Sequence, residues 1–157
     1  MRIIKSDSLL VESVGTNCLV FAHTKAAPSD AAWSSLLDYY DQHRQQLSQY
    51  RLFVITDGGG PTAMMRKTFQ ASFAKDAQGS RTAVISEAAI LRFTVSGLAL
   101  FISNVRSFSS EEAVAAVRYL ELANDQVHRV RDCIANLRAE AGPGFATLTA
   151  IDPTTIR

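Results

Sequence analysis

The sequence predicts an α/β domain with a mixed, mostly parallel sheet. Two apolar segments at 9–14 and 18–23 flank the turn residues "VGTN", which is typical of an antiparallel hairpin. Further along the chain, short apolar segments of strand length alternate with amphipathic helical segments. The 157 residues, 47% of them hydrophobic, suffice for one domain with a hydrophobic core. A hairpin followed by alternating helices and strands builds a layered α/β domain.

A first helix is expected directly after the hairpin. Pro28 and Ser29 are typical of a helix start, and Ser29 is a good N-cap residue. The apolar residues that follow recur with helical spacing, so we expect one buried face. They are Trp33, Leu36, Leu37, Tyr40 and Leu47. The next segment, "RLFVIT" at 51–56, predicts a central strand that is buried on both faces.

The middle of the chain continues the alternation of helix and strand. A second helix is expected over 62–75, and strands are expected at 81–86 and 104–108. The apolar segment 88–102 predicts a buried third helix, or one whose second face meets a partner or a lipid. The second helix has an apolar residue at every fourth position, namely Met65, Phe69 and Phe73.

The last part of the chain predicts a long helix and a polar tail. In "SSEE", Ser109 and Glu112 have the spacing of a capping box. An apolar seam continues to about residue 138, beyond a minimal domain of residues 1–122. The extension 123–157 therefore packs back on the domain or pairs with another chain. Its end, after "GPG", has the composition of a tail that frays.

Composition excludes several classes of function. The formal net charge is +1 without a basic cluster, so we expect no binding to nucleic acid or anionic membranes. Cys18 and Cys133 lie far apart, which favours a reduced, cytoplasmic context. Arg92 and Gly97 interrupt the most apolar segment, so we expect no membrane span. The three histidines lack ligand spacing, and we expect no metal and no cofactor.

The stretch "TDGGGPTAMMRK" at 56–67 is the main candidate site. Glycines before a helix start can form a phosphate-binding nest, but the lysine of a P-loop and the last glycine of GxGxxG are absent. A tight turn explains part of the pattern, with Asp57 accepting N–H groups of the turn. Three consecutive glycines exceed what a turn needs. We therefore expect a close approach of another backbone or of a partner at this loop.

The order of elements, together with "RLFVITDGGGPTAMMRK", "RTAVIS" and "NVRSF", resembles the STAS domain over roughly residues 8–122. The likeness is to the divergent SpoIIAA-like group of bacteria. The resemblance implies a non-enzymatic protein that docks a partner, as anti-sigma-factor antagonists do. In that fold a kinase phosphorylates a Ser or Thr just after the Asp, and the added charge breaks docking. Here Gly58 and Gly59 occupy that place, and Thr62 is the nearby hydroxyl at the helix start.

Three hypotheses of function follow. The first is a regulatory or scaffold module that binds a protein partner, such as a kinase, an anti-sigma-like protein or a scaffold protein. Its predicted binding residues are Asp57, Gly58, Gly59, Gly60, Thr62, Met64, Arg66 and Lys67, with Thr62 as the candidate phosphosite. The second is a small-ligand or phosphate-binding protein, or a small enzyme, that uses Asp57 and Glu87. The third is a homo-oligomer built on the C-terminal helix. The sequence contains no assignable catalytic set, which favours a non-enzymatic role.

Overall fold

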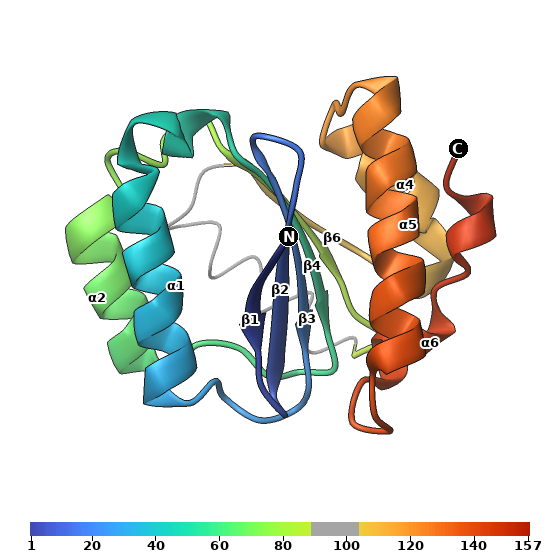
Figure 1. Ribbon diagram of the computed structural model, residues 1–157, viewed down its shortest axis with the longest axis horizontal. Coiled ribbons are helices and arrows are strands. Elements are labelled where there is room, and N and C mark those ends of the chain that lie inside the picture. Colours follow the sequence, from blue (N-terminus) through green and yellow to red (C-terminus); the bar gives the residue numbers. More distant parts are fainter. Residues whose placement is uncertain (89–103) are drawn as a thin grey trace.

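The computed structural model describes residues 1–88 and 104–157 and shows a sheet between two helical layers (Figure 1). The sheet has six strands in the order of the sequence. They are β1 (Arg2–Lys5), β2 (Leu9–Val14), β3 (Cys18–His23), β4 (Arg51–Thr56), β5 (Arg81–Ile85) and β6 (Val105–Phe108). Strands β1, β2 and β3 pair antiparallel, whereas β3, β4, β5 and β6 pair parallel. The predicted α/β class, hairpin and mixed sheet are confirmed.

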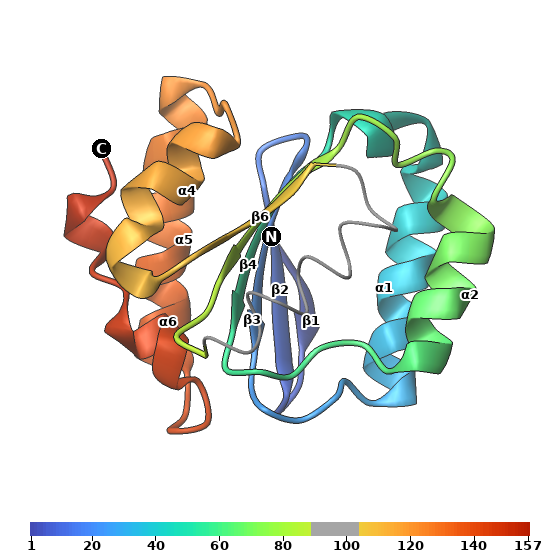
Figure 2. The same ribbon diagram turned by 180° about the vertical axis from the view of Figure 1, so that it is seen from behind.

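The helices cover the two faces of the sheet separately. Helices α1 (Asp30–Gln42) and α2 (Ala63–Phe73) lie on one face. Because β3, β4 and β5 follow one another in the sheet, the helices that connect them share that face. Helices α4 (Ala113–Tyr119), α5 (Asn124–Glu140) and α6 (Ala146–Ala150) cover the opposite face, as Figure 2 shows from behind. No helix in the described ranges has the length and apolarity needed to cross a membrane.

In the described part of the chain three short 3₁₀ helices complete the fold, and the predicted helix starts at Ser29 and Ser109 are confirmed. The 3₁₀ helices are η1 (Arg44–Gln49), η2 (Ser110–Glu112) and η3 (Pro153–Thr155). Ser29 caps α1, since its Oγ accepts the N–H of Ala32 at 3.2 Å. At the start of η2, the Glu112 carboxylate accepts the N–H of Ser109 at 2.8 Å. These side chains satisfy N–H groups that have no partner within the helix.

The two faces of the sheet carry separate hydrophobic cores. Against α1 and α2, most residues of the predicted apolar stripes are buried, with Leu36 and Phe73 only 3% exposed. Trp33, Leu37 and Phe69 are partly buried. Against α4, α5 and α6, the core contains Phe53 and Ile55 of β4 together with Ile134 of α5. The extension 123–157 thus shares one core with the sheet. Its apolar seam packs back on the domain, which answers the choice that the sequence left open.

The chain differs from the prediction at both ends. Strand β1 was not expected, since "RIIK" is short and carries charges at both ends. It pairs with β2, and its Arg2 forms an ion pair of 2.6 Å with Glu12. The expected tail is also wrong, because α6 and η3 bury Leu148 and Ile156 in the core. A polar-looking tail therefore holds its position through a few well-spaced apolar side chains.

The long C-terminal helix is interrupted. The prediction of one helix over 110–138 is wrong, since α4 ends at Tyr119 and α5 begins at Asn124. Glu121 lies between them with φ of 52°, a left-handed conformation that ends a helix. The break lets each helix lay its own apolar face on the sheet. The expected third helix falls almost wholly in 89–103, outside the described residues.

Candidate functional site

The glycine loop begins where β4 ends, and Thr56 organises its turn. The Thr56 Oγ1 accepts the N–H of Gly58 at 3.1 Å and donates to the carbonyl of Gly59 at 2.6 Å. Gly58 has φ of 120°, a region that residues with a Cβ rarely adopt. We expected Asp57 to accept the N–H groups of the turn. That expectation is wrong, because Thr56 takes this role and leaves the Asp57 carboxylate available for another contact.

Gly59 lies against the backbone of its own chain. A Cβ on Gly59 would stand 2.1 Å from the Thr24 carbonyl oxygen and 2.4 Å from that of Ala26. The N–H of Gly59 donates to the same Thr24 oxygen at 2.8 Å. The close backbone approach predicted from the glycines is therefore intramolecular at this position. Gly60, by contrast, has nothing within 4 Å of an added Cβ, so no steric contact requires glycine there.

Asp57 fastens the C-terminal extension to this edge of the sheet. Its carboxylate oxygens accept the N–H groups of Ala146 at 2.7 Å and Thr147 at 2.6 Å. Both donors belong to the first turn of α6, where a negative charge also complements the helix dipole. The Thr147 hydroxyl adds a bond to the Thr56 carbonyl at 3.3 Å. The C-terminal extension thus covers part of the surface beside Asp57.

Glu87, the second carboxylate of the ligand or enzyme hypothesis, also accepts a backbone N–H. Glu87 Oε1 accepts the N–H of Ser110 at 2.7 Å, which ties the end of β5 to the start of η2. Asp57 and Glu87 therefore bind different backbone segments, an arrangement that fits structural roles. The described part of the chain contains no cluster of three His, Cys, Asp or Glu side chains that could hold a metal ion.

Four of the predicted binding residues form an exposed group at the start of α2. Gly58, Thr62, Met64 and Lys67 are exposed, and Met64 has 72% of its surface accessible. Among the described residues, only Met1 is a comparably exposed large hydrophobic residue. Thr62 is the N-cap of α2, and its Oγ1 accepts the N–H of Met65 at 3.2 Å. We call Gly58, Gly60, Thr62, Met64 and Lys67 the corner surface.

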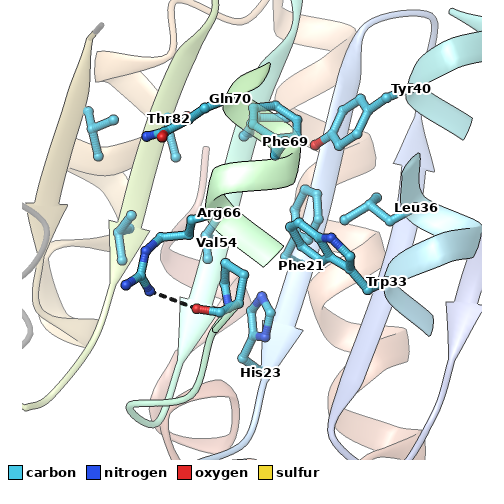
Figure 3. Close-up of a pocket in the computed structure, with 14 residues that line it drawn as sticks. Phe21, His23, Trp33, Leu36, Tyr40, Val54, Arg66, Phe69, Gln70 and Thr82 are labelled. Atoms are coloured by element: carbon cyan, nitrogen blue, oxygen red, sulfur yellow. Dashed lines mark hydrogen bonds between the residues drawn. The ribbon is translucent and has the colours of Figure 1, made fainter. Parts of the chain in front are cut away.

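Arg66 does not belong to the corner surface. It lines a cavity that the sequence did not predict. It donates to the Pro61 carbonyl at 2.7 Å and lines a cavity of about 160 Å³ between the sheet and helices α1 and α2 (Figure 3). On the sheet side the wall includes Leu52 and Val54, which are only partly buried. The expectation that β4 is buried on both faces is therefore wrong on this face. No residue spacing signals such a cavity, because its walls come from separate elements.

One buried histidine also lines the cavity. His23, at the end of β3, is 7% exposed and stacks on Phe21 with ring centroids 6.3 Å apart. Burial lowers the pKa of His23 from 6.5 to about 4, so its imidazole is neutral at pH 7. A neutral imidazole offers one N–H donor and one acceptor nitrogen.

The comparisons with known proteins add no relative to this description. No protein-family model matches the chain, and no curated protein or solved structure matches it either.

Proposed function

We propose that this chain is a non-enzymatic, STAS-like regulatory or scaffold module that binds a protein partner through the corner surface. The observation that supports this proposal best is the exposure of Met64 beside a loop that contacts with other parts of the chain hold in place. Methionine is flexible and polarizable, and it is common at surfaces that bind proteins. The neighbouring Lys67 adds a positive charge. The partner chemistry that fits is an apolar pocket with an acidic rim.

Within this proposal the eight predicted residues divide into two roles. Asp57 and Gly59 bind other parts of the same chain and support the loop. The residues of the corner surface make the contact. Arg66 lines the cavity and stands apart from both groups. Because the contacts of Asp57 and Gly59 already fix the loop, it loses little conformational entropy on binding, which favours affinity.

Regulation by phosphate at Thr62 belongs to the same proposal. The Thr62 side chain is exposed and stands at the N-cap of α2. A phosphate there would meet the positive end of the helix dipole and leave the fold intact. At the same time it would place about two negative charges beside Met64, against an acidic partner rim. The expected result is loss of docking without loss of folding.

The experiment is affinity capture from native lysate with the full chain, followed by mass spectrometry and by titration of the protein captured. Met64→Glu and Gly60→Glu should each weaken binding about thirtyfold or more, as expected for a central interface residue. Gly60 is suitable because an added side chain meets no neighbour there, whereas a side chain at Gly59 would disrupt the loop. Arg129→Glu, on the exposed face of α5, is the control. Equal capture by Met64→Glu and the unaltered chain would refute the proposal.

The other two hypotheses receive less support from the geometry. The apolar seam of α5 is buried in the chain's own core, so it no longer motivates self-assembly. Asp57 and Glu87 each accept backbone N–H groups, so they do not form a free pair of carboxylates for acid–base catalysis.

A further inference from the structure

The cavity between the sheet and helices α1 and α2 has the size and lining of a small-molecule site. Its volume of about 160 Å³ is similar to that of engineered cavities, roughly 150 Å³, that bind benzene. Ligand sites are typically apolar, with a few polar groups that orient the ligand. Aromatic and aliphatic side chains dominate this lining, including Phe21, Trp33, Leu36, Phe69 and Val84.

Three residues that line this cavity carry a buried polar atom without a hydrogen bond. The described residues contain five buried side-chain N or O atoms that lack a hydrogen bond. Three of these atoms belong to residues that line the cavity, namely His23 Nδ1, Trp33 Nε1 and Thr82 Oγ1. A buried polar group without a partner destabilises the fold, so such groups are rare in native structures. A polar group bound in the cavity would give these atoms a hydrogen-bond partner.

Arg66 supplies a positive charge at the same site. Its Nη1 donates to Pro61, and no carboxylate pairs with its guanidinium among the residues that the structure describes. Figure 3 shows Arg66 and His23 in the same half of the cavity, with Thr82 in the other half. Since burial keeps His23 neutral at pH 7, Arg66 decides the charge of a ligand. A guanidinium binds a carboxylate through paired N–H donors.

We propose that this cavity binds a small carboxylic acid with a compact aromatic or branched apolar body, about the size of benzoate. The carboxylate pairs with Arg66 and receives a hydrogen bond from the His23 imidazole. The apolar body packs between Phe21, Trp33 and Phe69. This site is separate from the corner surface, because Met64 and Lys67 do not line the cavity.

Trp33 provides a direct readout, since it is the one tryptophan of the chain and lines the cavity. Titration of the full chain with benzoate and with phenylacetate should change its fluorescence in a saturable way. Acetate lacks the apolar body and should bind at least about tenfold more weakly. Bound acid should also raise the melting temperature in a concentration-dependent manner.

Substitutions distinguish a specific carboxylate site from non-specific binding of apolar compounds. Arg66→Gln should weaken benzoate at least about tenfold, while binding of the neutral analogue benzyl alcohol stays the same. Lys67→Gln, the exposed neighbour, should leave benzoate binding unchanged. Met64→Glu should do likewise, which keeps this test independent of partner docking. The proposal is overturned if neither acid gives a saturable signal, or if Arg66→Gln binds benzoate as tightly as the unaltered chain.

Discussion

The carboxylate of Asp57 accepts the backbone N–H of Thr147 at 2.6 Å, across 90 positions of the sequence. This contact joins the glycine loop to the C-terminal extension. It gives the acidic residue after β4 a structural role, and it explains why the end of the chain is held in place. The loop and the extension are therefore expected to respond together to substitutions.

Loss of the Asp57 carboxylate should loosen the extension. Asp57→Ala removes two hydrogen bonds of a charged acceptor and should lower the free energy of unfolding by about 2 kcal/mol. Hydrogen exchange should accelerate most in residues 144–157, because α6 loses the acceptor at its first turn. Urea denaturation and exchange mass spectrometry measure the two effects. Asp38→Asn, an exposed change on α1, is the control, and unchanged exchange at the C-terminus in Asp57→Ala would contradict the prediction.

Two neighbouring glycines should respond differently to alanine. Gly59→Ala places a Cβ against the Thr24 and Ala26 carbonyls and should cost about 2–3 kcal/mol of stability. Gly60→Ala meets open space and a negative φ, so it should be neutral or stabilise by up to about 1 kcal/mol. Thermal and urea denaturation of the matched pair give the difference directly. Equal stability of the two variants would show that the loop does not pack on residues 24–26.

His23 should make stability depend on pH. Burial lowers its pKa from 6.5 to about 4 in the folded chain, so the unfolded chain binds more protons in between. The free energy of unfolding should therefore fall as the pH drops from about 6.5 to about 4, by about 3 kcal/mol from this group. Arg66 is the charged residue that shares the cavity lining with His23.

A non-titrating ring isolates the effect of His23. His23→Phe should remove most of the extra loss between pH 6.5 and 4, and it keeps a planar ring beside Phe21. His128→Gln, an exposed change on α5, is the matched histidine control. Urea denaturation at several pH values gives the comparison. A profile for His23→Phe that parallels the unaltered chain would assign the pH dependence to other groups.

Thr62 allows capping and charge to be tested apart. Thr62→Ala removes the acceptor for the Met65 N–H and should cost about 1 kcal/mol. Thr62→Asp keeps an N-cap acceptor, so its stability should stay near that of the unaltered chain. If the corner surface docks an acidic partner, Thr62→Asp should lose binding while Thr62→Ala keeps it. The reverse order of binding would exclude a phosphate switch at this residue.

Local patterns were sufficient for most elements of the fold. The hairpin at 9–14 and 18–23 was read from apolar segments around a turn, and Ser29 marked the start of α1 correctly. Such signals succeed because hydrogen bonding within a helix and the alternation of a strand involve residues close in sequence. Strand β1 was missed for the converse reason: four residues carry little periodicity, and only pairing with β2 makes them a strand.

The sequence by itself determined the α/β class, the order of the main elements and the helix start at Thr62, because these depend on neighbouring residues. Tertiary structure alone decided what the glycine loop does. It placed Gly59 against the backbone of residues 24–26 and bonded Asp57 to the first turn of α6. It also left Met64 at the surface and formed the cavity beside Arg66. Each of these features joins segments that are far apart along the chain. Packing brings these segments together, and a local sequence pattern does not predict which distant segments will be in contact.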